Sequence, residues 1–379
     1  MENFIAYNPT KLHFGKGILD DLHKTLVKYG KRVLLVYGKG SIKKNGLYEK
    51  IMSQLNTAGA EVFEYEGIKS NPLVEDVDKA ARIGRENNVD FVLAVGGGSV
   101  IDSAKIISIT IPVSHGAWDF FEGKSRPQKA LPLIAVLTLA ATGSEMNNFA
   151  VLQNPETKQK EGYGSPFTFP THSFLDPEVT YSVPATYTAY GIADLIAHCL
   201  EMYYGKGECS LTDRFITSIV ADAVAWGPKL MNNLTGYEER ANIMFDATMA
   251  LNLITSYGKA GGDWGVHDLG HIVSLLHDTP HGASLSILFP AWLKHFNAVV
   301  GEKTALLGKN VFNVSSAEET IKKLEAFFTT IGAPTRFSQI GIGEDKLEGI
   351  IQQMIQNKAT GNNITMAEKD YRKIIELAK

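Results

Sequence analysis

Short apolar runs alternate with helical patterns through the first half of the chain. The apolar runs fall at residues 32–37 (RVLLVY), 61–65 (EVFEY), 91–95 (FVLAV) and 131–137 (LPLIAVL). Between them, apolar residues recur at helical spacing over residues 47–55, 74–86 and 100–107. Buried strands separated by helices of this length are typical of a parallel sheet with helices on both faces. We therefore predict an α/β domain with a Rossmann-like parallel sheet.

The pattern changes near residue 149. Prolines and a glycine-rich turn interrupt residues 149–180, which indicates a hairpin and an irregular crossing between domains. Long amphipathic helical patterns then follow at residues 187–204, 211–230, 240–257 and 320–331. We therefore predict an α/β domain over residues 1–185 and an all-α domain over residues 186–379.

Composition narrows the class of protein. A chain of 379 residues with 44% hydrophobic and 21% charged residues fits a globular protein of two domains. Its net charge of -4 gives no reason to expect a nucleic-acid or membrane partner, and no apolar run approaches the roughly 20 residues of a membrane span. The opening residues resemble no secretory signal, and the two cysteines, Cys199 and Cys209, form no CxxC pattern. We expect a cytoplasmic protein.

A run of glycines follows the FVLAV segment directly. Gly96, Gly97, Gly98 and Ser99 come before a predicted helix that begins at Val100. Glycine lets backbone N–H groups approach a phosphate, and a helix N-terminus adds the positive end of its dipole. Ser99 could cap the helix or donate its hydroxyl to the phosphate. The run predicts a pyrophosphate site; the alternative is a tight turn that binds nothing.

A second loop, Gly38-Lys39-Gly40-Ser41, leaves the RVLLVY segment. In dinucleotide-binding sheets an acidic residue at such a position favours NAD(H), whereas small or basic residues admit the 2′-phosphate of NADP(H). Here Gly38 occupies the position, and Lys39, Ser41 and Lys43 offer donors and positive charge. We predict a preference for NADP(H) over NAD(H); the alternative is a solvated turn with surface lysines.

Histidines gather in the predicted helical domain. Asp194 and His198 are spaced i, i+4, which places both on one helix face. Four more histidines lie within fifteen residues, at positions 267, 271, 277 and 281. Carboxylate and imidazole ligands suit Fe²⁺ or Zn²⁺ acting as a Lewis acid on a substrate oxygen. Spacing alone does not choose among the four, although Pro280 should end the preceding helix and leave His281 in a turn.

Several longer motifs occur in a fixed order along the chain. They are GKG at residues 15–17, YGKGS at 37–41, NP at 71–72, GGGSVIDSAK at 96–105, TLAATGSE at 138–145, DP at 176–177, GIADLIAH at 191–198, HDLGH at 267–271 and TPHG at 279–282. On these motifs the chain resembles the iron-containing alcohol dehydrogenase family over essentially its whole length. It looks closest to the branch of butanol dehydrogenases and NADPH-dependent aldehyde reductases.

The resemblance implies a dinucleotide-binding domain followed by a metal-binding domain, in a dehydroquinate synthase-like architecture, and typically a homodimer. It implies a metal, Fe²⁺ or else Zn²⁺, with the ligands Asp194, His198, His267 and His281. His271 matches a residue near the nicotinamide and substrate, which suggests a proton relay. The implied cofactor positions, to which the phosphate argument adds Lys39, are Gly38, Ser41, Asn71, Gly97, Gly98, Ser99, Asp102, Thr138, Thr142, Asn147 and Lys160.

The expected function is that of a metal-dependent alcohol dehydrogenase or aldehyde reductase, which moves hydride between NADP(H) and a small alcohol or aldehyde. Leu139 and Ala141 replace a threonine and a glycine of the family's usual TTAGTGSE pattern. We therefore expect that the hydrogen bond to the cofactor at position 139 is either lost or made by the backbone. One alternative is a lyase of the dehydroquinate synthase type, but its polyanionic substrate needs basic residues that residues 194–198 and 264–281 lack. The other is a non-catalytic nucleotide sensor, which the four candidate ligands argue against.

Overall fold

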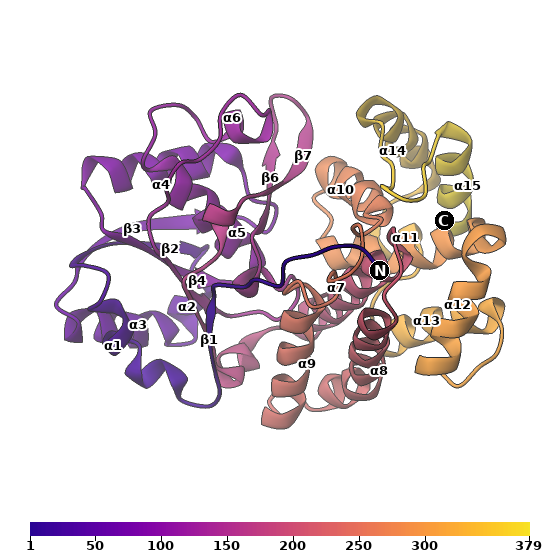
Figure 1. Ribbon diagram of the computed structural model, residues 1–379, viewed down its shortest axis with the longest axis horizontal. Coiled ribbons are helices and arrows are strands. Elements are labelled where there is room, and N and C mark those ends of the chain that lie inside the picture. Colours follow the sequence, from indigo (N-terminus) through magenta and orange to yellow (C-terminus); the bar gives the residue numbers. More distant parts are fainter. The chain divides into compact units, whose positions relative to one another are not determined.

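The computed structural model describes all 379 residues and divides them into two compact units. Tyr7–Val183 form the α/β unit, and Pro184–Lys379 together with Met1–Ala6 form the helical unit (Figure 1). The expected α/β domain covered residues 1–185, but the first six of these residues belong to the helical unit. They belong to the helical unit because the Glu2 amide donates to the carbonyl of Gly258 at 2.9 Å and the Phe4 ring stacks on Tyr257.

The α/β unit contains a six-stranded, wholly parallel sheet in the order β1-β8-β5-β4-β2-β3. The strands are β1 (Lys11–Phe14), β2 (Arg32–Gly38), β3 (Glu61–Ile68), β4 (Phe91–Gly96), β5 (Leu133–Leu137) and β8 (His172–Leu175). The interior strands β4 and β5 are buried along their whole length because helices cover both faces, as Figure 1 shows for α1 and α3 on one side and α4 and α5 on the other. The predicted parallel sheet is confirmed.

Helices of four to thirteen residues lie between these strands in the sequence. Their bounds are α1 (His23–Leu26), α2 (Ser41–Lys44), α3 (Leu47–Thr57), α4 (Val74–Glu86), α5 (Gly98–Thr110) and α6 (Trp118–Phe121). Helix α5 begins at Gly98, two residues before the predicted start, and its N-cap is Gly97. Ser99 is therefore inside the first turn rather than at the cap, and its hydroxyl donates to the carbonyl of Ser70.

Two strands of the sheet, β1 and β8, were not predicted. Each has only four residues, too few for a pattern to stand out, and HSFL does not alternate between polar and apolar positions. They are strands because of their pairing: β8 pairs in parallel with both β5 and β1. A hydrogen bond of 2.8 Å joins Nε2 of His13 on β1 to Nδ1 of His172 on β8. The predicted hairpin is confirmed as the antiparallel pair β6 (Phe149–Asn154) and β7 (Gln159–Gly164).

The helical unit is built around α7 (Ala185–Tyr204), which is buried on nearly every side and packs against α8, α9 and α11. The other helices are α8 (Ser210–Asn232), α9 (Tyr237–Ala250), α10 (Gly265–His277), α11 (His281–His295), α12 (Asn297–Val311), α13 (Ala317–Thr330), α14 (Glu344–Asn357) and α15 (Glu368–Ala378). The predicted helix at 240–257 ends at Ala250, because the chain turns at Leu253 with a positive φ of 83°. None of the helices combines the length and apolar character that a membrane crossing requires.

Candidate functional site

Helix α7 presents three buried polar side chains on one face. Asp194, His198 and Glu201 follow one another at i, i+4 and i+7, a spacing that places them on the same side of a helix. Their exposed fractions are 2%, 5% and 1%. Buried ionisable groups on an otherwise apolar helix are costly unless they are paired or bind a metal ion, so this face marks a site.

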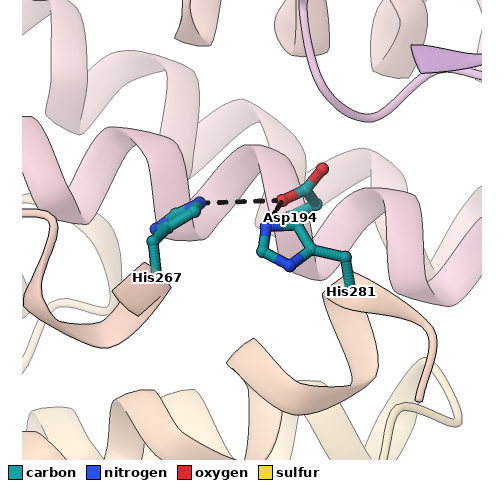
Figure 2. Close-up of side chains that lie close together, drawn as sticks. All are labelled: Asp194, His267 and His281. Atoms are coloured by element: carbon teal, nitrogen blue, oxygen red, sulfur yellow. Dashed lines mark ion pairs between the residues drawn. The ribbon is translucent and has the colours of Figure 1, made fainter. Parts of the chain in front are cut away.

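Three imidazoles converge on one oxygen of Asp194. Its Oδ1 lies 3.7 Å from Nε2 of His198, 4.0 Å from Nε2 of His267 and 3.8 Å from Nε2 of His281. Figure 2 shows His267 and His281 pointing toward the carboxylate from two different segments. Ligand atoms of Asp194, His267 and His281 all lie within 4.8 Å of one another. His198 is outside that trio but stacks on His267, with ring centroids 4.9 Å apart.

His281 reaches the site from the start of a helix. The sequence placed it in a turn after Pro280, but helix α10 ends at His277 and His281 is the first residue of α11. The next residue, Gly282, explains how α11 comes so close to α7. A Cβ atom at Gly282 would lie 2.0 Å from the carbonyl oxygen of Tyr190, so any larger residue would push His281 away from Asp194.

Glu201 fixes the orientation of His267. Its Oε1 accepts hydrogen bonds from the backbone amide and from Nδ1 of His267, both at 2.9 Å. Because a carboxylate only accepts, Nδ1 carries the proton and Nε2 presents a lone pair. That buried Nε2 has no hydrogen-bond partner. A lone pair facing a carboxylate is unfavourable unless a cation lies between them, so the residues fit a divalent metal.

A second acidic residue supports the start of α10. Asp263 is buried, and its carboxylate accepts hydrogen bonds from the backbone amides of Gly265, Asn363 and Ile364. Burial raises the pKa of Asp263 to about 6. Trp264 follows in the left-handed region, with φ of 64°, and its ring lies edge-on to His267 with centroids 5.1 Å apart. This strained junction holds His267 against α7.

The two other histidines of α10 take different places. The ring of His271 lies 5.3 Å from that of His281, one turn beyond His267, and it is only partly buried. It therefore lies next to the candidate ligands but retains a path for proton exchange. His277, at the end of the helix, is outside the group; burial and the nearby Lys346 lower its pKa.

In the α/β unit, the glycine run lies where β4 passes directly into α5. The amide of Thr138, just after β5, donates to the carbonyl of Gly96 at 3.0 Å, which joins the two strand ends. A Cβ atom at Gly98 would lie 2.4 Å from the Thr142 side chain, so only glycine allows this close approach. Gly97, Gly98, Thr138 and Thr142 thus share one edge of the sheet, the edge at which parallel sheets bind nucleotides.

A buried polar network lies behind this edge. Lys105, fully buried, donates to Oδ1 of Asn147 at 2.9 Å and to the carbonyl of Phe149 at 2.6 Å. Asp102 accepts from the hydroxyl of Ser144 and the amide of Val151. Burial lowers the pKa of Lys105 to about 8 and raises that of Asp102. Asp102 and Asn147, expected at the cofactor, therefore bond chiefly to the protein itself, and Lys105 was missed.

Two further cofactor candidates form a pair. Nζ of Lys160, on β7, donates to Oδ1 of Asn71 at 2.9 Å, and both side chains are buried. Gly38 ends β2, while Lys39 and Ser41 are exposed in the loop and short helix that follow. Because β2 pairs with β4, this loop adjoins the edge that carries the glycine run.

Family models match both halves of the chain. Residues 9–177 match the model described as iron-containing alcohol dehydrogenase, and residues 188–378 match the C-terminal domain of the Fe-containing alcohol dehydrogenase family. The chain belongs to the iron-containing alcohol dehydrogenase family. The resemblance seen in the motifs is therefore confirmed, and the chain is an oxidoreductase of this family.

Several similar proteins in this family carry names from the expected branch. The chain is 43% identical over 99% of both sequences to a probable NADH-dependent butanol dehydrogenase 1 of Bacillus subtilis. It is 32% identical to the NADPH-dependent aldehyde reductase YqhD of Escherichia coli, over the full length of both. The crystal structure of the NADH-dependent butanol dehydrogenase A of Thermotoga maritima is 34% identical, covers 100% of this chain and 99% of its own, and gives a TM-score of 0.95.

Proposed function

We propose that this chain is a metal-dependent alcohol dehydrogenase and aldehyde reductase, which transfers hydride between NAD(P)H and a small aldehyde or alcohol. The observation that carries the proposal is the convergence of three imidazole nitrogens, at 3.7 to 4.0 Å, on Oδ1 of Asp194. In the proposal, Asp194, His198, His267 and His281 hold one divalent ion, Fe²⁺ or Zn²⁺.

When bound, the metal supplies a Lewis acid for the substrate oxygen, and the nicotinamide supplies or accepts the hydride. The protein's own residues orient the ligands, move the proton and bind the coenzyme. Glu201 holds His267 in the tautomer that leaves Nε2 free to ligate. His271 exchanges the substrate proton with solvent, because it lies beside His281 yet is only partly buried. The amides at Gly97 and Gly98 bind the pyrophosphate at the start of α5.

The proposed function includes both coenzymes. The predicted preference for NADP(H) rests on the loop at residues 38–41, and the similar proteins include enzymes named for each coenzyme. Both coenzymes are therefore part of the assay. We further propose a homodimer in the cytoplasm, on the strength of the family resemblance; light scattering in solution and cell fractionation test these two points.

The experiment that tests the function is metal removal and reconstitution. Purified protein is stripped with a chelator and then loaded with Fe²⁺ or Zn²⁺, and oxidation of NADH and of NADPH is followed with butyraldehyde. Activity should vanish in the stripped protein and return with metal, while binding of coenzyme to the stripped protein persists. A fully active metal-free protein would refute the proposed role of the four ligands.

A further inference from the structure

An acidic side chain lies beside the loop that follows β2. Glu66 is near the end of β3, which pairs in parallel with β2. A Cβ atom at Gly40 would lie 3.5 Å from Oε1 of Glu66, so the carboxylate borders the loop. The loop and the carboxylate are far apart in the sequence, because the loop follows β2 and Glu66 is on β3.

Glu66 also holds the lysine that was expected to bind a phosphate. Nζ of Lys43 lies 2.7 Å from Oε2 of Glu66 and over the rings of Tyr37 and Tyr48, at 5.1 and 5.2 Å from their centroids. The Lys43 and Glu66 side chains are 40% and 45% exposed, and an ion pair this exposed is weak. A bound phosphate could pair with Lys43 in place of Glu66, but the Glu66 carboxylate would then lie unpaired next to the phosphate.

A neighbouring carboxylate reinforces the negative charge. Glu64 is two residues before Glu66 and so on the same face of β3. It accepts hydrogen bonds from the hydroxyls of Tyr37, at 2.6 Å, and Tyr48, at 2.9 Å. The Tyr37 hydroxyl lies 3.4 Å from Oε2 of Glu66 as well. Two carboxylates against the single ammonium of Lys43 leave the cluster with a net negative charge that opposes another anion.

The position of this cluster relative to the glycine run gives it a role. In parallel nucleotide-binding sheets the pyrophosphate lies at a helix N-terminus and the adenosine ribose at the end of the adjacent strand. Here that helix is α5, which follows β4, and the adjacent strand is β2. A carboxylate at this place accepts hydrogen bonds from ribose hydroxyls and repels a 2′-phosphate.

We propose that Glu66 is a specificity-determining residue that makes the chain favour NAD(H) over NADP(H). It does so by neutralising Lys43 and by placing a negative charge where the 2′-phosphate would lie. This inference rests on the proposed function, in which the loop at residues 38–41 receives the adenosine ribose, and it reverses the coenzyme preference expected from the sequence.

The test is the variant Glu66→Gln, which keeps the shape of the side chain and removes its charge. We expect wild type to favour NADH, and the variant to gain about tenfold in kcat/KM with NADPH, the scale of a modest like-charge repulsion. The gain should shrink at about 1 M salt, because screening weakens an exposed charge, whereas a structural effect would not respond to salt. Glu61→Gln is the matched control, since Glu61 is at the opposite end of β3, paired with Arg32.

Binding measurements separate this inference from the proposed function. Calorimetry with 5′-ADP and with 2′,5′-ADP reports the ribose site without any turnover. If neither nucleotide binds wild type, the proposed nucleotide site is wrong and the inference fails with it. If both bind and wild type prefers the 2′-phosphate, or if Glu66→Gln leaves the ratio of the two affinities unchanged, the nucleotide site stands and Glu66 does not select the coenzyme.

Discussion

The α/β unit and the helical unit assemble their sites in different ways. In the α/β unit the candidate nucleotide site is made of short contiguous loops, residues 38–41 and 96–99, that parallel pairing of β2 and β4 brings to one edge. In the helical unit, Asp194, His267 and His281 come from three helices and meet at one carboxylate oxygen. A loop that binds through backbone amides tolerates side-chain changes except where a side chain would block it, as at Gly98, whereas a centre built of single side chains depends on each of them. Single substitutions should therefore affect the helical unit more.

The largest effect is expected for His281→Ala, which removes one of the converging imidazoles. We expect kcat to fall by at least about 10³-fold with loss of bound metal, because several kcal/mol of charge stabilisation disappear. Nucleotide binding, measured by fluorescence titration, should be unchanged. His277→Ala is the matched control, since His277 is outside the group. A His281→Ala variant with normal metal content would remove His281 from the ligand set.

His271→Ala tests whether the helical unit contains a group that moves protons without binding the ion. We expect normal metal content and a rate lowered by about 10² to 10⁴-fold, the usual range for general acid–base help. Added imidazole should restore part of the rate. If the variant loses its metal, His271 is a ligand and one of the proposed four is not.

Glu201 tests how far the centre depends on side chains behind the ligands. Glu201→Ala should weaken metal binding by about 10 to 100-fold, because His267 loses the carboxylate that orients it. Glu201→Gln should cost less, since its amide oxygen still accepts from Nδ1. Competition with a chelator gives the affinities, and the exposed Glu208→Ala is the control. Equal affinities for wild type and Glu201→Ala would show that His267 needs no such support.

Lys105→Met is the corresponding test in the α/β unit. The change removes a buried charged donor from Asn147 and from the carbonyl of Phe149. Hydrogen bonds to charged groups contribute about 1.5 to 3 kcal/mol, so the free energy of unfolding should fall by about 2 kcal/mol. Urea denaturation measures this loss, and metal content should stay the same. An unchanged unfolding midpoint would mean that the network adds nothing to stability.

The smallest effect concerns pH and the pair His13 and His172. Burial, His13 and the nearby Lys11 and Lys28 lower the pKa of His172 from 6.5 to about 4. Between pH 6.5 and about 4, His172 therefore binds a proton in the unfolded chain but not in the folded chain. This residue's contribution to the free energy of unfolding is complete above about pH 6.5 and declines as pH falls toward 4.

The variant His172→Gln cannot take up that proton. It should be less stable than wild type at neutral pH because the bond to His13 weakens, but the difference in Tm should narrow by about 2 to 4 °C as pH falls. The partly buried His115 provides the control, since His115→Gln should leave the wild-type slope intact. A constant difference across the pH range would show that His172 titrates normally.

The sequence predicted those parts of the molecule that depend on local pattern. Strands β2, β4 and β5 were visible as apolar runs, and the i, i+4 pair Asp194 and His198 was visible as a helix face. Strands β1 and β8 were missed because each has only four residues and is held in the sheet by pairing, β1 with β8 and β8 also with β5.

Residues that support a site from behind, or act on it from a neighbouring strand, were harder to predict from the sequence. Glu201 continues the spacing of Asp194 and His198 by one more turn, so a search for carboxylates at i+7 would have found it. Lys105 gave no such signal, since a lysine in a helix is ordinarily on the surface. Glu66 acts on a loop from a neighbouring strand, and only the strand order reveals that they adjoin.

The division of the helical unit into two pieces has a consequence for the order of events during synthesis. Met1–Ala6 leave the ribosome before Tyr7–Val183, but Gly258, whose carbonyl accepts from Glu2, is made only after the whole of Tyr7–Val183. At about 5 to 20 residues per second, the interval between them is roughly 10 to 50 seconds. The α/β unit thus has time to fold while the first six residues wait, and their docking is among the last steps of maturation. Ribosome-stalled chains ending before and after residue 258 should differ in whether a protease can remove this segment.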